Sequence, residues 1–219
     1  MARIVITGAN KGIGLELTRQ LADRGDEVIA TVRKTSDDLS KLNVEVIEGV
    51  DVGDDDAVAR LAQSLEGRTI DVLINNAGIL TREGLHDLDW DAIRRQFEIN
   101  TLGPLRVTKA LLPCMTGGGK VAILSSRMGS LAQNAGGSYA YRISKTAVNM
   151  VGSNLAIDLK EKGIAVILLH PGHVATDIND HSGPVKTDES ARGLIPLIDA
   201  LTLETTGTFW NYEGDELPW

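Results

Sequence analysis

Short apolar runs alternate with longer segments of helical spacing along almost the whole chain, and this alternation most limits the folds available to it. The runs are rich in β-branched residues, and near-continuous apolar runs are typical of strands buried on both faces of a parallel sheet. Six of them are found, at residues 4–6, 28–32, 44–47, 72–74, 121–124 and 164–169. Strands that alternate with helices predict an α/β fold.

The segments between the runs have the apolar spacing of helices. Leu15, Leu17 and Leu21 mark one such segment, and a longer one from about residue 138 to 162 ends at Gly163. The predicted fold is a doubly wound parallel sheet, a Rossmann-type three-layer sandwich. The 219 residues suit a single domain. Ligands of such sheets bind beyond the carboxyl ends of the strands.

The charge of the chain excludes several classes of function. Thirty acidic and 22 basic residues give a net charge of −8, which disfavours nucleic acid and anionic membranes as partners. No apolar run reaches the roughly 18 residues of a membrane span, and no signal peptide is evident. A lone cysteine, Cys114, fits a reducing compartment, so we expect a cytoplasmic protein. The four histidines lack metal-ligand spacing, so no metal site is expected.

A glycine-rich turn follows the first apolar run. Gly8, Gly12 and Gly14 have the spacing G-x-x-x-G-x-G, and a helical pattern begins there. Such glycines let the backbone approach a pyrophosphate closely, and free amides at the helix start would meet its charge. The alternative is a strand-to-helix turn without a ligand.

From this turn onward the sequence resembles the short-chain dehydrogenase/reductase family. The resemblance covers nearly the whole chain, because further motifs of that family occur in the same order. They are Thr7 to Gly14, Asp51-Val52, Asn75-Asn76-Ala77-Gly78, Asn100, Ser125-Ser126, Tyr141-x-x-x-Lys145 and Pro171-Gly172.

Tyr141 and Lys145 are the strongest candidates for catalysis. Four residues apart on a helix, they share one face. A nearby ammonium lowers the pKa of a phenol, so the pair suits proton transfer in carbonyl reduction or alcohol oxidation. The resemblance implies that Lys145 also holds the nicotinamide ribose. Alternatively, Tyr141 packs at a helix start and Lys145 is a solvated charge. Tyr139 has Ile143 four residues on, so it cannot take this role.

The resemblance assigns Ser126 to stabilise the carbonyl oxygen, a task that suits a hydroxyl donor. Ser126 and Tyr141 are 15 positions apart, two more than is usual in the family, and the glycine-rich stretch at 134–138 can hold the extra residues. Ser125 and Ser130 stay open as substitutes. Asn100 would hold a water that links Lys145 to solvent, or it kinks or caps a helix.

The second strand ends in Arg33 and Lys34, with no carboxylate at its tip. A carboxylate there would select NAD, whereas a basic residue would pair with the 2′-phosphate of NADP. Lys11 adds a positive charge inside the glycine turn, and Asp37 and Asp38 belong to a following loop. We therefore expect NADP rather than NAD, although Arg33 and Lys34 could also lie on a solvated loop.

Together the spacing and the resemblance predict two sets of site residues. The catalytic set is Asn100, Ser126, Tyr141 and Lys145. The cofactor-binding set is Gly8, Asn10, Lys11, Gly12, Ile13, Gly14, Arg33, Asp51, Val52, Asn75, Ala77, Gly78, Tyr141, Lys145, Pro171, Gly172, Val174 and Thr176.

Several later segments of the chain bear on the substrate and on the assembly of subunits. The stretches at 125–142 and 207–212 resemble the C-factor-like branch of the family and its sniffer-type carbonyl reductases. Residues 177–187 are expected to form a short substrate lid. Tyr212 and two neighbouring tryptophans could form a substrate wall, a packing cluster or a subunit contact. The helix face with Val148 and Leu155 either covers the sheet or pairs subunits, and the family commonly forms dimers or tetramers.

The resulting prediction is an NADP(H)-dependent oxidoreductase that transfers a hydride between nicotinamide and a small carbonyl or alcohol substrate. The alternative is a dinucleotide-binding signalling protein of the C-factor type with little or no catalysis.

Overall fold

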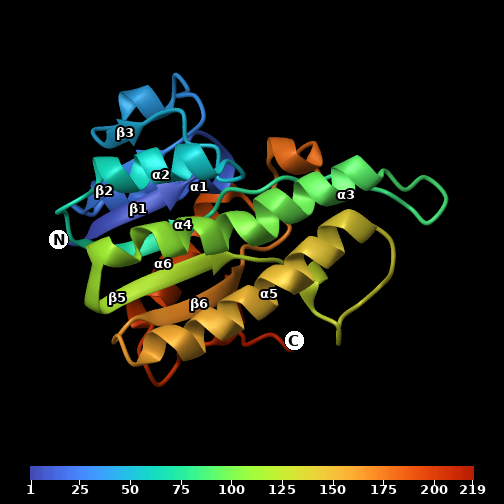
Figure 1. The fold of residues 1–219 in the computed structure, drawn as a ribbon. Coiled ribbons are helices and arrows are strands. Elements are labelled where there is room, and N and C mark those ends of the chain that lie inside the picture. The colour runs from blue at the N-terminus through green and yellow to red at the C-terminus, as the bar shows by residue number, and fades with distance from the viewer.

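The computed structural model describes residues 1–219 and contains one parallel sheet of seven strands in the order β3-β2-β1-β4-β5-β6-β7 (Figure 1). The strands are β1 (Arg3–Thr7), β2 (Glu27–Thr31), β3 (Glu45–Ile47), β4 (Ile70–Asn75), β5 (Met115–Leu124), β6 (Ala165–His170) and β7 (Thr208–Asn211). The predicted doubly wound fold is confirmed. The strand order reverses between β1 and β4, which is where such sheets bind ligands.

Helices form a layer on each face of the sheet. Helices α2 (Asp55–Ser64), α4 (Gly103–Leu111) and α5 (Tyr139–Lys160) share one apolar core with the sheet, and α1 (Gly12–Asp23) and α6 (Thr187–Ala200) share the other. Helix α3 (Trp90–Phe97) continues through a π-helical turn, η2 (Glu98–Leu102), into α4, and this long helix runs beside α5 (Figure 1). Short 3-10 helices are η1 (Leu39–Lys41), η3 (Leu112–Cys114), η4 (Arg127–Gly129) and η5 (Asp177–Asn179).

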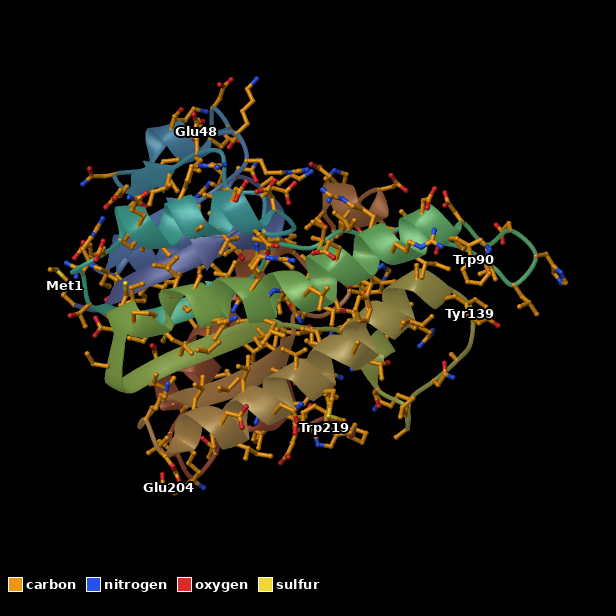
Figure 2. All side chains as sticks on the ribbon, in the orientation of Figure 1. Met1, Glu48, Trp90, Tyr139, Glu204 and Trp219 are labelled. Atoms are coloured by element: carbon orange, nitrogen blue, oxygen red, sulfur yellow. The ribbon has the colours of Figure 1, made fainter.

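The carboxyl ends of the strands face the side of the molecule where α3 and α5 begin. In Figure 2, Trp90 and Tyr139 mark these two helix starts, and Met1, just before β1, lies on the opposite side. The loops after β1, β2, β4, β5 and β6 therefore gather at one edge of the sheet. None of the helices is both long and apolar enough to cross a membrane.

Two strands differ from the sequence prediction. β7 was not predicted, because its four residues are too few to show a period. It is held in place by Phe209, which is fully buried against Leu168 and pairs with it in register. β5 begins six residues before the apolar run, across three glycines that have low strand propensity, and Gly118 N donates to Gly163 O at 2.7 Å.

The apolar face of α5 covers the sheet. Val148, Leu155 and Leu159 are buried in the core. At Gly152 a β-carbon would overlap the side chain of Leu168, so the helix backbone lies directly on β6. The face that the sequence left open between two roles thus serves packing within the chain.

Candidate active site

A cavity of about 1750 Å³ opens along the carboxyl ends of the strands. Its wall includes the glycine turn after β1, the ends of β4, β5 and β6, and the first turns of α5. One end of the cavity is formed by the glycine turn and the tip of β2. The other is formed by Ser126, Tyr141 and the loop after β6.

The glycine turn is fastened to the end of β4 by one asparagine. Asn76 Nδ2 donates to Thr7 O at 2.9 Å and to Gly8 O at 3.0 Å, and Thr7 Oγ1 accepts from Asn76 N and Ala77 N, each at 3.1 Å. A β-carbon on Gly14 would overlap Asn76 Nδ2 and Gly8 O. Gly8 has φ +67°, which favours glycine. The turn is therefore held in a shape that larger residues could not adopt.

The amino end of α1 differs from those of its neighbours. Asp54 and Asp89 cap α2 and α3 with their carboxylates, whereas Lys11 makes no capping bond on α1 and no acidic residue lies in its first turn. The first backbone amides of α1 lack an intrahelical partner, and the residues that carry them, Gly12, Ile13 and Gly14, line the cavity. A pyrophosphate would satisfy them, so the residues present fit a dinucleotide.

The tip of β2 carries the predicted basic residues, and one of them lines the cavity. Arg33 is exposed, lines the cavity and has no carboxylate partner, whereas Lys34 does not line it. Asn10 Nδ2 donates to Lys34 O at 3.2 Å, and Ser36 Oγ donates to Asn10 O at 2.6 Å, so the glycine turn and the β2 loop hold each other. Arg33 thus stands where a 2′-phosphate could be bound.

Two carboxylates near this end have partners already. Asp51 accepts from Gly53 N at 2.9 Å and pairs with Arg95 at 3.1 Å. Burial raises the pKa of Asp51, but the Gly53 amide, Arg95 and the charge of Arg33 outweigh it and hold the pKa below the usual range. Across the cavity, Lys11 Nζ pairs with Asp177 at 3.3 Å.

Ser126, Tyr141 and Lys145 meet at the other end of the cavity. Ser126 and Tyr141 both line the cavity, close enough for the Ser126 hydroxyl to lower the pKa of Tyr141, and Lys145 Nζ lies 5.7 Å from the centre of the Tyr141 ring. Lys145 Nζ donates to Leu124 O at 2.7 Å and has no carboxylate partner. The longer spacing between Ser126 and Tyr141 is taken up by an exposed loop at 131–138, where Gly136 and Gly137 have positive φ.

The environment shifts the titration of both groups. Burial raises the pKa of Tyr141 to about 12, against a lowering by the Ser126 hydrogen bond. Burial also lowers the pKa of Lys145 to about 8. A phenol with a raised pKa holds its proton, and a cation arriving beside it would favour the phenolate. The arrangement can therefore deliver a proton to an oxygen bound between Ser126 and Tyr141, or remove one.

The three serines predicted as alternatives have different partners. Ser125 Oγ bonds to Asn149 Oδ1 at 2.5 Å, and Ser130 Oγ donates to Trp219 O at 3.2 Å. Ser126 is the serine whose hydroxyl lowers the pKa of Tyr141, and its Oγ accepts from Met128 N at 3.2 Å. Ser125 and Ser130 are thus bonded to the scaffold, and Ser126 lies near Tyr141 in the cavity.

Asn100, predicted to hold a water that links Lys145 to solvent, does not itself line the cavity. In the π-helical turn η2 its Nδ2 donates to Ile79 O at 2.8 Å and to Ser144 Oγ at 3.0 Å, and its Oδ1 accepts from Ile79 N at 2.8 Å. Both side-chain donors are thus used within the protein. The geometry gives this side chain a positioning role between the loop after β4 and α5.

Asn75, predicted to bind the cofactor, does not line the cavity. It is buried, and its Nδ2 donates to Thr108 Oγ1 of α4 at 3.1 Å. Side chains of a strand alternate in direction, so Asn75 points to the helix layer, and it is Asn76 that reaches the glycine turn. Asn76 was present in the same motif, but its role required the tertiary contact with β1.

The loop after β6 closes the cavity from the other side. Pro171, Gly172, Val174 and Thr176 all line it, as predicted. A β-carbon on Gly12 would lie 3.2 Å from Thr176 Cγ2, so this loop lies directly against the glycine turn. Residues that the sequence did not single out for the site also line the cavity. They include Ser36, Asn76, Arg82, Arg127, Arg142 and His173.

The aromatic residues near the carboxyl end separate into two roles. Tyr212 lines the cavity, whereas Trp219 stacks on Phe209 with ring centres 5.6 Å apart and Trp210 packs against the apolar core. Only Tyr212 could form part of a substrate wall.

Comparison with known proteins shows the family of the chain. The model of the short chain dehydrogenase family matches residues 2–186. A 1-hydroxy-2-glutathionyl-2-methyl-3-butene dehydrogenase of Rhodococcus sp. (strain AD45) is 45% identical over the full length of both chains. C-signal of Myxococcus xanthus is 47% identical over 68% of this chain and 93% of its own.

Solved structures agree in fold. The carbonyl reductase Sniffer of D. melanogaster has a TM-score of 0.92 and 30% identity, with both chains fully covered. An NADPH-bound carbonyl reductase from chicken fatty liver has a TM-score of 0.91 and 27% identity, covering 100% of this chain and 99% of that one. With a full-length dehydrogenase relative and a matching family model, the chain belongs to the short-chain dehydrogenase/reductase family of oxidoreductases.

Proposed function

We propose that the protein is an NADP(H)-dependent carbonyl reductase or alcohol dehydrogenase that acts on a small molecule in the cytoplasm. The observation that carries this proposal is the meeting of Ser126, Tyr141 and Lys145 in the same cavity as the uncapped amino end of α1. The compartment is inferred from Cys114, which is unpaired and buried.

The bound nicotinamide would accept or supply the hydride. Ser126 would donate a hydrogen bond to the substrate oxygen and hold it beside the Tyr141 hydroxyl. Tyr141 would give its proton to that oxygen in reduction and take it back in oxidation. Lys145, held by Leu124 O, would place a positive charge near Tyr141 and favour the phenolate after proton transfer.

The preference for NADP depends on Arg33. Arg33 lines the cavity without a carboxylate partner, and the chicken liver structure holds NADPH. A guanidinium can bind a phosphate through two hydrogen bonds. We expect kcat/KM for NADPH to exceed that for NADH by at least about tenfold. Arg33→Ser should lower this ratio about 10- to 100-fold, as expected for loss of a charge-assisted bond.

Lys34→Ser is the matched control, because Lys34 neighbours Arg33 but does not line the cavity. Initial rates with each cofactor, read as nicotinamide absorbance at 340 nm, give the ratio. A preference for NADH in the wild-type protein would contradict this part of the proposal.

The second candidate is a signalling protein of the C-factor type that binds the dinucleotide and catalyses little. Its support is the similarity to C-signal over 68% of the chain. A panel of aldehydes, ketones and quinones with NADPH, and of alcohols with NADP, separates the two. Turnover of any of them favours the enzyme. NADPH binding with no turnover across the panel favours the signalling protein.

We also propose that residues 177–187 form a lid over the substrate. Asp177, His181 and Val185 line the cavity, and Val174 forms a β-bridge with Val185 that closes the segment into a loop. Asp180 and His181 both have positive φ. Residues other than glycine adopt a positive φ at some energetic cost, and such strained backbone is common in ligand clamps and switch segments.

A homo-oligomer is proposed on the outer face of α5. Ile143, Met150 and Ile157 are spaced seven residues apart and are 46%, 62% and 70% exposed. They form a stripe opposite the face that covers the sheet, and burying it in a second copy would remove this apolar area from water.

Ile157→Glu should convert a dimer or tetramer into a monomer, because it would bury a charge without a partner. Light scattering coupled to size exclusion gives the mass. Val151→Ile, on the inner side of the same helix, is the control and should leave the mass unchanged. A wild-type monomer would disprove the assembly.

A further inference from the structure

Three arginines of the cavity wall have no role in the proposed reaction. Arg127 directly follows Ser126, Arg142 directly follows Tyr141, and Arg82 lies in the loop after β4. All three line the cavity. Arg127 and Arg142 are thus sequence neighbours of the proposed catalytic residues and share one cavity with them.

None of these arginines forms an ion pair, although the chain has 30 acidic residues. Elsewhere most arginines are paired with carboxylates, as Arg68 is with Glu45 at 2.7 Å. Four of the five acidic side chains that line the cavity are themselves paired with a cation. The fifth, Glu213, accepts from Asn211 Nδ2 at 3.4 Å. All five carboxylates that line the cavity have other partners, and none of them is paired with the three arginines.

Arg142 is held in place while part of its guanidinium stays open. Its Nε donates to Gly136 O at 3.0 Å and its Nη1 donates to Met128 O at 3.3 Å. Its Nη2 has no protein partner, and Arg127 makes no side-chain hydrogen bond to the protein. Met128 belongs to η4, the short helix that begins at Arg127. The bond from Arg142 to Met128 O therefore ties Arg142 to the helix that carries Arg127.

A histidine in the wall of the same cavity lies within the field of Arg127. His170, at the end of β6, lines the cavity, and its Nδ1 is buried without a hydrogen-bond partner. Burial, the charge of Arg127 and the neighbouring His173 lower the pKa of His170 to about 4, so the ring is neutral at pH 7. The charge of Arg127 therefore reaches the end of β6.

We propose that the substrate carries a carboxylate, bound by Arg127 and Arg142 beside the Ser126–Tyr141 pair. This inference rests on the proposed reductase function and names the substrate class of that site. A guanidinium fork matches the two oxygens of a carboxylate and can bind them through two charge-assisted hydrogen bonds. The carbonyl at one end of the substrate would then be aimed at Ser126 by the carboxylate at the other.

Two aldehydes of the same shape test the proposal. 4-Formylbenzoate carries a carboxylate, and methyl 4-formylbenzoate is its neutral ester. The ratio of kcat/KM for the acid to that for the ester should fall about 10- to 100-fold in Arg127→Gln and in Arg142→Gln, as expected for loss of a charge-assisted hydrogen bond. Arg60→Gln is the matched control, because Arg60 is exposed on α2, unpaired and outside the cavity. It should leave the ratio unchanged.

A binding measurement makes the test independent of turnover. With saturating NADPH, benzoate should raise the Tm of the wild-type protein and of Arg60→Gln, and benzamide should not. The benzoate shift should be lost in Arg127→Gln and Arg142→Gln. If inorganic phosphate gives the same shift as benzoate, the arginines form a general anion site and the carboxylate assignment is overturned.

The two proposals fail in different ways. If neither aldehyde is reduced and no compound of the wider panel is turned over, the proposed reductase function is wrong, and the benzoate shift still decides the carboxylate site. If the ester is reduced but the acid-to-ester ratio is the same in all variants, the carboxylate site is wrong and the reductase function stands.

Discussion

Tyr141→Phe should lower kcat for carbonyl reduction by about 10²- to 10⁴-fold, the usual contribution of a general acid. The substitution removes one oxygen and keeps the ring that Lys145 faces at 5.7 Å. The hydroxyl that would give its proton to the substrate is then gone, while Ser126 and Lys145 stay in the cavity wall. The Kd for NADPH, measured by fluorescence titration, should change by less than about threefold, because the glycine turn, Arg33 and Lys145 stay in place.

Tyr139→Phe is the matched control. Tyr139 lies two residues earlier on α5, is 37% exposed and does not line the cavity. It should keep the wild-type kcat. A Tyr141→Phe variant with wild-type turnover would remove the mechanism proposed for this site, whereas loss of both turnover and NADPH binding would make Tyr141 chiefly a binding residue.

Lys145→Met should abolish most turnover and also stabilise the protein. Burial lowers the pKa of Lys145 from 10.5 to about 8, so keeping the ammonium in the folded chain costs about 3 kcal/mol at neutral pH. Methionine fills a similar volume without charge, and the loss of the bond to Leu124 O offsets about 1 kcal/mol of the gain. We expect a net stabilisation of about 1–2 kcal/mol, or roughly 2–8 °C in Tm.

The pH dependence identifies the cause of that gain. Between pH 8 and 10.5 the unfolded chain holds the Lys145 proton and the folded chain does not, so wild-type stability rises with pH in this range relative to Lys145→Met. Below pH 8 both states hold the proton and the difference between the two proteins is constant. Chemical denaturation at pH 7, 8, 9 and 10 measures this difference.

Lys162→Met, at an exposed position after α5, controls for the general effect of removing one positive charge. The difference in stability between Lys162→Met and the wild-type protein should not change between pH 8 and 10. A Lys145→Met protein that is less stable than wild type at pH 7 would show that the ammonium stabilises the fold, contrary to this prediction.

The fold was predictable because its signals are local and repeated. Each apolar run is long enough to show β-branched character, and the segments that form α1 and α5 show a helical period. β7 was missed because its four residues become a strand only when Phe209 is buried against Leu168 of β6. A short strand that depends on one long-range contact has no local signature.

The site was predictable where its residues are close in sequence. Tyr141 and Lys145 are one helical turn apart, and the glycine turn is continuous, so spacing alone brings these groups together. Asn75 and Asn76 were harder, because neighbouring residues at a strand end point to opposite sides. The structure puts Asn75 against Thr108 and Asn76 against the glycine turn.

The sequence by itself determined the parallel sheet, the dinucleotide turn and the tyrosine–lysine pair, because those features depend on periods and spacings along one segment. Only the tertiary structure decided which serine meets Tyr141, what Asn100 holds, and that Arg127 and Arg142 share a cavity with the catalytic hydroxyls. These pairings join loops from different strands. Their partners are set by which strand ends are adjacent in the sheet, and the spacing of residues along the chain carries no record of that.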